Sequence, residues 1–173
     1  MKRSKVIMGM PVVIEIADEN ATDEAVNEVF SYFHYIDEKF STYKKSSEIS
    51  KINRGELVFS DYSLEMQKIL TLCQETKNQT KGYFNIEIKR KIDPSGLVKG
   101  YAIFEGAKIL QKKGYKNFYV EIAGDIQVFG KNKNKEKWKV GIQNPFNLKE
   151  IVRVVKISDR GIATSGNYQR GDR

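Results

Sequence analysis

The stretch DPSGLVKGYA, residues 93–102, brings together residue types that can bind a charged ligand. It contains Asp93, Pro94, two glycines and Lys99, which offer a carboxylate, a tight turn and a cation just ahead of a helical pattern. A helix N-terminus presents free N–H groups and the positive end of the helix dipole, so a negatively charged ligand is one use of this stretch. A helix cap followed by a solvated lysine is the other. The stretch alone leaves both interpretations open.

Three more polar clusters stand where a strand or helix is expected to begin or end. They are MGMP at 8–11, FSTY at 40–43 and AGDI at 123–126. Loops held by a rigid scaffold are the usual place for binding residues. Ordinary turn chemistry explains the same clusters, so neither interpretation is excluded.

Several other chemistries are disfavoured by what the sequence lacks. It contains no G-x-x-x-x-G-K-[ST] and no G-x-G-x-x-G motif, so the common nucleotide-binding folds are not indicated. The only histidine, His34, lies on the flank of a helical pattern, which predicts a surface residue and not a metal ligand. The only cysteine, Cys73, excludes an internal disulfide, and its spacing is typical of a small core residue.

The elements that must position these clusters follow an α+β pattern. Apolar residues spaced three and four apart predict helices from a cap at Thr22 to Phe40, from a cap at Ser63 to Asn78, and over 98–113. Extended segments are expected at 6–16, 57–59, 80–88, 117–122, 126–129, 138–142, 151–157 and 161–164. Because the helices come early and the strands late, we predict helices packed on an antiparallel or mixed sheet, in one domain over 1–173.

The chain is basic, with a net charge of +8 and a pI near 9.4. Much of the excess lies at 89–91 and in KNKNKEK at 131–137, which we interpret as a solvated hairpin loop. No aromatic residues are interleaved with these basic residues, so nucleic-acid binding is only a distant alternative. No apolar run approaches the roughly 20 residues that span a bilayer. The basic, apolar start lacks a cleavage site, so we expect a first strand and, by default, a cytoplasmic protein.

Taken in order, the clusters resemble the ApbE family, the FAD:protein FMN transferases. The matching pieces cover nearly the whole chain: MGMP at 8–11, FSTYKKSSEISKIN at 40–53, TKGYFNI at 80–86, DPSGLVKGYA at 93–102, AGDI at 123–126, WKVGIQNP at 138–145 and GIATSGNYQRG at 161–171. The resemblance implies an ApbE-like α+β fold. It also implies transfer of FMN from FAD to a Thr or Ser hydroxyl of an acceptor protein, with Mg²⁺ bound and AMP released.

The resemblance further implies a set of site residues. Asp93 would hold a polar group of FAD, the backbone carbonyl of Gly96 would bind the metal, and Lys99 would neutralise diphosphate charge. The other positions that match the FAD site are Met8, Tyr43, Phe84, Asn85, Ile86 and Asp125. Tyr43 would stack on a flavin or adenine ring, and relatives often have Asp where this chain has Asn85. No catalytic residue is assigned.

The sequence also differs from the family after the GIATSG motif. Members continue after GIATSG with a His-containing segment, further strands and a late Asp and Thr that complete the metal site, whereas this sequence ends at Arg173. We therefore expect a C-terminally incomplete domain, and two functions stay open. One is a flavin transferase whose site a partner chain completes, and the other is an FAD-binding module or FAD hydrolase. Members are often periplasmic or lipid-anchored.

Overall fold

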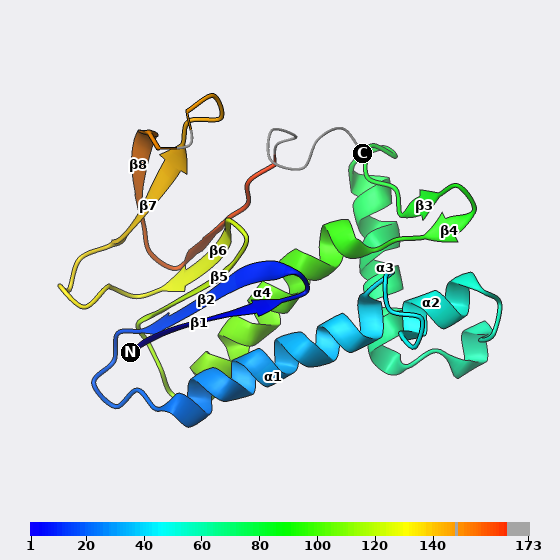
Figure 1. Cartoon of the computed structure of the whole chain (residues 1–173), viewed down its shortest axis with the longest axis horizontal. Coiled ribbons are helices and arrows are strands. Elements are labelled where there is room, and N and C mark those ends of the chain that lie inside the picture. Colours follow the sequence, from blue (N-terminus) through cyan, green and yellow to red (C-terminus); the bar gives the residue numbers. More distant parts are fainter. Residues whose placement is uncertain (148, 166–173) are drawn as a thin grey trace. The chain divides into compact units, whose positions relative to one another are not determined.

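The computed structural model describes residues 1–147 and 149–165, which fold into two compact units (Figure 1). The first unit consists of Met1–Val6, Met10–Val29 and the described part of Ile103–Arg173, and the second of Ile7–Gly9 and Phe30–Ala102. Two long helices, α1 (Asp23–Phe40) and α4 (Ser95–Lys112), contribute residues to both. Helices and antiparallel strands in this order confirm the predicted α+β class.

The first unit is built on a five-stranded sheet with the order β1-β2-β5-β6-β9. Its strands are Lys2–Ile7 (β1), Met10–Ile16 (β2), Phe118–Ile122 (β5), Asp125–Phe129 (β6) and Arg160–Ile162 (β9). Alternate side chains are buried, and the register sets buried Val120 of β5 opposite buried Ile14 of β2, so both strands turn their apolar residues to one face. The helices that run along the sheet carry buried Ala25, Val26, Val29, Ile103, Ala107 and Leu110 (Figure 1).

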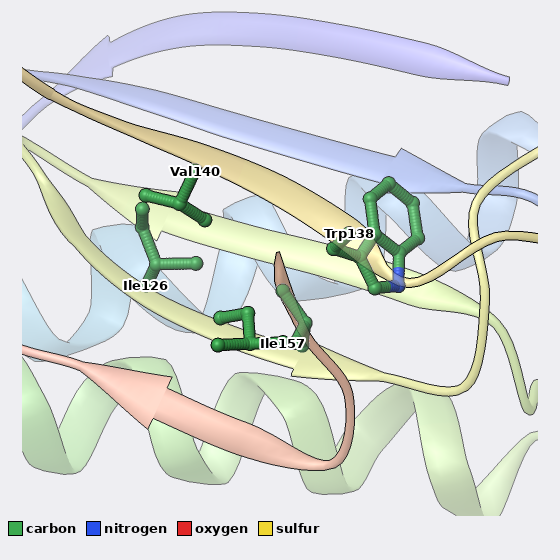
Figure 2. Close-up of a cluster of buried hydrophobic side chains, with 5 residues drawn as sticks. Ile126, Trp138, Val140 and Ile157 are labelled. Carbon is green, nitrogen blue, oxygen red and sulfur yellow. The ribbon is translucent and has the colours of Figure 1, made fainter. Parts of the chain in front are cut away.

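A separate two-stranded ribbon covers the other face of this sheet. It consists of β7 (Trp138–Gln143) and β8 (Ile151–Ile157). Side chains of the ribbon and of β6 form one buried cluster, shown in Figure 2: Ile126, Val128, Trp138, Val140 and Ile157. The indole N–H of Trp138 donates to the carbonyl of Phe129 at 2.9 Å, so its polar atom is satisfied within the cluster.

The ribbon corrects the prediction for the basic segment 131–137. β6 pairs with β9 and β7 pairs with β8, so this segment connects two different sheets and does not close a hairpin. The sequence signal for a solvated loop was correct, but it carried no information on which strands pair. Strand partners are chosen by side-chain packing across the sheet, which is a tertiary property.

The second unit contains three further helical elements and a small hairpin. They are α2 (Glu48–Asn53), the 3-10 helix η1 (Phe59–Asp61), α3 (Leu64–Gln79), and strands β3 (Glu87–Ile88) and β4 (Lys91–Ile92). Ser63 caps α3 as predicted, because its hydroxyl accepts from the Met66 amide. Cys73 is buried as predicted, and burial raises the pKa of its thiol to about 11, so it is not an activated nucleophile.

Three local predictions were wrong. The strand expected at 57–59 is instead a connection leading into η1. The last long helix begins at Ser95 and not near residue 98, because the Pro94 carbonyl accepts hydrogen bonds from the amides of Leu97 and Val98. The strand expected over 6–16 is a hairpin whose two strands are joined at Met8 and Gly9. His34 is exposed, as predicted. Every helix in the described part of the chain falls short of the length and apolarity that a membrane crossing requires.

The hairpin turns share one backbone pattern. Each of the β1–β2, β3–β4 and β5–β6 connections has two residues, and all six have positive φ: Met8 57°, Gly9 66°, Lys89 48°, Arg90 65°, Ala123 45° and Gly124 84°. This sign pattern is that of a type I′ turn, whose twist matches that of paired strands. Glycine occupies the second position in two of these turns, where it avoids the Cβ clash, but Arg90 occupies it in the third.

We predict that replacing Arg90 with glycine stabilises the protein. A residue with a Cβ in the left-handed region costs about 1 kcal/mol relative to glycine, so Arg90→Gly should raise the free energy of unfolding by up to that amount. Arg90→Ala removes the same charge but keeps the Cβ, and it should give no such gain. Urea denaturation of the three proteins measures the difference. Equal stability of the glycine and alanine variants would show that the turn is not strained.

Candidate functional site

The second unit contains a cavity of about 510 Å³, which is within the roughly 300–1,000 Å³ range of small-molecule sites. Its walls come from the loop that follows α1, from α2 and from the β3–β4 hairpin. Its lining includes Tyr43, Lys45, Asn53, Lys89, Lys91 and Asp93. Two of the predicted site residues, Tyr43 and Asp93, are therefore brought together at one cavity.

Two buried serines fix the loop that carries Tyr43. Ser47 is the N-cap of α2: its hydroxyl accepts from the Ser50 amide and donates to the carbonyl of Ser41 at 2.7 Å. The Ser50 hydroxyl also donates to that carbonyl, at 3.4 Å. A cap and a loop anchor are thus made by the same side chains, which explains why small hydroxyl residues are buried here. The loop is held in place at the start of α2.

The side-chain amide of Asn53 joins α2 to the hairpin. Its Nδ2 donates to the carbonyl of Ile92 at 2.9 Å, and its Oδ1 accepts from the Ile92 amide at 2.7 Å. The amide therefore satisfies both backbone groups of Ile92, as a neighbouring strand would. Ile92 immediately precedes Asp93, so this pair of hydrogen bonds sets the position of that carboxylate on the cavity wall.

Asp93 is in turn tied to its neighbours on both sides. Its amide donates to the carbonyl of Ile86 at 2.8 Å, and its Oδ1 accepts from the Ser95 amide at 3.0 Å. A Cβ built on Gly96 would lie 3.4 Å from the ring of Phe84. The structure thus gathers Ile86, Phe84 and Gly96 around Asp93, and the cavity adjoins the first turn of α4. Asn85 is exposed, and its Oδ1 accepts from the Glu87 amide.

Positive charge dominates the cavity wall. Lys45, Lys89 and Lys91 are exposed, and in the part of the chain that the structure describes no carboxylate pairs with any of them. The fourth cation, Arg54, is already engaged: it donates to both oxygens of Glu56 at 2.6 and 2.9 Å. Asp93 is the single carboxylate among the described lining residues. An anionic ligand would compensate this excess charge.

Tyr43 is 82% exposed although it lines the cavity. It is therefore not a packing residue, and its ring is accessible to a ligand. Met8 is half-buried in the β1–β2 turn with a φ of 57°, so it is not a core residue either. An exposed aromatic ring and a half-buried thioether are both suited to ligand contact.

The remaining predicted residues lie outside the cavity lining. Lys99 is half-buried on α4, and Gly96 is exposed in its first turn. Asp125 belongs to the first unit, where its Oδ1 accepts from the Thr164 amide at 3.0 Å. Within residues 1–147 and 149–165, no group of three or more His, Cys, Asp or Glu side chains is arranged to hold a metal ion. The roles that the resemblance implies for these residues stay predictions.

This α+β fold and its motif-bearing loops have counterparts among known proteins. A model described as "ApbE family" matches residues 8–91 and 87–171. The chain belongs to the ApbE family. The FAD:protein FMN transferase of Haemophilus influenzae is 23% identical over 234 aligned residues, which cover 97% of this chain and 68% of that protein. The transferase of Vibrio cholerae is 33% identical over 79 residues, which cover 45% of this chain and 24% of that protein.

Solved structures show the same fold. The ApbE protein of Thermotoga maritima superposes with a TM-score of 0.86 at 19% identity, over 98% of this chain and 71% of that one. The flavin transferase ApbE of Vibrio cholerae superposes with a TM-score of 0.84 at 21% identity, over 100% and 74%. These likenesses confirm the predicted ApbE-like fold. The match to the Vibrio cholerae transferase spans only about a quarter of that protein.

Sequence reasoning did not identify four residues of the cavity wall. Asn53 ends the FSTYKKSSEISKIN motif, but nothing in the motif says that its amide bonds to a strand 39 residues later. Lys89 and Lys91 were interpreted only as part of a basic surface, and Lys45 only as a member of the FSTYKKSSEISKIN motif. The available sequence signal was the run of cations at 89–91. It occupies a two-residue turn, where two other turns of this chain have glycine.

We predict that Asn53 is essential for the cavity wall. Asn53→Ala leaves the Ile92 amide and carbonyl without a protein partner, which should lower the free energy of unfolding by about 1–3 kcal/mol. Asn134→Ala is the matched control, because Asn134 lies on the exposed 131–137 segment. Hydrogen exchange should show faster exchange at Ile92 and Asp93 in the first variant only. Unchanged exchange at these amides would show that the two hydrogen bonds from the Asn53 side chain do not hold Ile92 in place.

Proposed function

We propose that this protein binds FAD in the cavity of the second unit and transfers its FMN half to a Thr or Ser hydroxyl of an acceptor protein. The observation that carries the proposal is the convergence of Tyr43 and Asp93, from two separate motifs, on one cation-rich cavity. Membership of the ApbE family supports it, as do relatives that carry the name FAD:protein FMN transferase. Neither the cavity chemistry nor the fold requires a nucleic acid as partner.

In the proposed reaction, the hydroxyl oxygen of the acceptor bonds to the FMN phosphorus. The bond between that phosphorus and the bridging oxygen breaks, AMP leaves with the bridging oxygen, and the hydroxyl proton passes to solvent. Negative charge develops on the phosphate oxygens, so donors and cations aimed at them lower the barrier. In the first turn of α4, the amides of Ser95, Leu97 and Val98 are bonded to Asp93 and Pro94, so the Gly96 amide is the proposed phosphate donor. Lys99 is the cation proposed to face the diphosphate from that helix.

The residues present fit a divalent cation that arrives with its nucleotide. Mg²⁺ commonly keeps several waters and takes phosphate oxygens as ligands, with few protein groups. In α4 the Gly96 carbonyl accepts from the amide four residues on, and its second lone pair stays available to a metal. We propose this carbonyl as a protein ligand. When bound, the cation would neutralise charge on the diphosphate.

Each remaining residue is proposed to have a binding role. Tyr43 stacks on a ring of FAD, and the half-buried Met8 contacts the same ligand. Phe84, Asn85 and Ile86 form a wall beside Asp93, through the hydrogen bond from Asp93 to the Ile86 carbonyl. For Asp125 we keep only the FAD-binding role that its position in the AGDI motif implies. No described residue is assigned as a general base.

We predict that the protein releases AMP from FAD only when Mg²⁺ is present. Purified protein is incubated with FAD, with Mg²⁺ or EDTA, and AMP is quantified by chromatography, with NAD⁺ as the control dinucleotide. Faster AMP release on addition of an acceptor flavoprotein, together with covalent flavin on that acceptor, supports the transferase. AMP release without covalent flavin indicates an FAD hydrolase. Flavin quenching without any AMP indicates an FAD-binding module.

We predict that the ring of Tyr43, and not its hydroxyl, contributes to FAD affinity. Base stacking on an aromatic side chain contributes about 1–3 kcal/mol, so Tyr43→Ala should weaken FAD binding roughly 5- to 150-fold while Tyr43→Phe retains it. Because Tyr43 is 82% exposed, neither change should alter the melting temperature. Tyr83→Ala is the control, since Tyr83 is 97% exposed and does not line the cavity. Equal losses from the Ala and Phe variants would refute stacking.

A further inference from the structure

The β3–β4 hairpin lies where this chain departs from its family. The family model matches in two blocks that overlap only at residues 87–91, which form most of the hairpin. The alignment with the Haemophilus influenzae protein runs over 234 residues, more than the 173 of this chain, so that relative has segments that this chain lacks. We infer that the hairpin replaces a longer segment of other family members. Its side chains would then belong to a part of the cavity wall that is particular to this chain.

The short hairpin places cations at the cavity. Lys91 lies on β4 opposite Ile88, and Lys89 occupies the first position of the turn, with a φ of 48°. Both lysines line the cavity, and Lys45 contributes a third charge from the loop after α1. A turn that holds lysine and arginine at positive φ is strained, and strain is retained more often at functional sites than elsewhere.

The three ammonium groups lack anionic partners within residues 1–147 and 149–165, although the chain contains many carboxylates. Lys44, the neighbour of Lys45, is fully engaged by Asp37 and Glu38, which shows that nearby acids are available to lysines in this loop. Lys39 likewise pairs with Glu48. The cavity lysines are therefore a concentration of uncompensated charge, next to an accessible aromatic ring.

We propose that Lys45, Lys89 and Lys91 form a phosphate-binding site for a nucleotide whose ring stacks on Tyr43. This proposal deepens the function proposed above and rests on it, because FAD is a dinucleotide with a diphosphate. Lys45 and the hairpin lysines contact the diphosphate from the cavity wall that they line. Lysine suits this task because its ammonium group is a compact point charge that binds phosphate without a fixed geometry.

The test compares two ligands that differ only in their phosphates. ADP and adenosine are titrated by calorimetry in EDTA-containing buffer, so that no metal contributes to either affinity. The proteins are the wild type, the double variant Lys89→Gln/Lys91→Gln, and Lys45→Gln. The control is Lys131→Gln/Lys137→Gln, which removes the same charge from an exposed segment of the first unit. Lys89→Arg/Lys91→Arg keeps the charge at the hairpin.

The wild type and the control are expected to bind ADP at least about tenfold more tightly than adenosine. The Lys89→Gln/Lys91→Gln variant should lose most of this preference, Lys45→Gln part of it, and the arginine variant little. Added salt should weaken ADP binding to the wild type more than to the glutamine variant. Adenosine affinity should be the same throughout, which also reports that the cavity is still folded.

Two results would overturn the proposal: a wild type that binds ADP no better than adenosine, or glutamine variants that match the control. Either of them, combined with Mg²⁺-dependent AMP release from FAD, would leave the transferase function standing and remove the lysine site. The reverse combination, a lysine-dependent preference for ADP without any cleavage of FAD, would support the site and contradict the transferase. The two proposals thus fail separately.

Discussion

The two hydrogen bonds between the side chain of Asn53 and the backbone of Ile92 are the constraint on which the cavity depends. They give one amide side chain the role of a neighbouring strand, and they couple α2 to a hairpin of only two residues per strand. A hairpin of this size is marginal by itself in water. With Ile92 held, the following residue, Asp93, is positioned for its own bonds to Ile86 and Ser95. The two hydrogen bonds from Asn53 thereby help to position the Asp93 carboxylate, the hairpin cations and the first turn of α4.

The cavity wall divides into residues that hold the backbone and residues that are accessible to a ligand. Ser47 and Ser50 are buried, and both hydroxyls donate to the carbonyl of Ser41, so these side chains hold the loop. Tyr43 and the lysines, by contrast, are exposed on a backbone that the first group fixes. This division reduces the entropy lost on binding, because the loop is already ordered before the ligand arrives.

In the first unit, other elements pack against both faces of the sheet. The helices cover one face and the β7–β8 ribbon covers the other, through the Trp138 cluster (Figure 2). Buried side chains therefore lie on both faces of the sheet at β6, which follows the turn after β5. Asp125 begins the strand after this turn, and its carboxylate binds the backbone of Thr164 from the GIATSG motif. Two separated motifs are therefore joined in this unit, as two others are joined at the cavity.

The sequence by itself determined the long helices, the Ser63 cap, the burial of Cys73 and the α+β class, because periodicity and capping act within a few neighbouring residues. The ordered motifs also pointed to the ApbE family and to Tyr43 and Asp93. The sequence did not predict the turn at Met8 and Gly9, the pairing of β7 with β8, or the hydrogen bonds between Asn53 and Ile92. Each of these depends on which distant segment supplies a hydrogen-bond partner or an apolar surface. Only the tertiary structure decides that choice, and it brought Lys45, Lys89 and Lys91 together in the wall of one cavity.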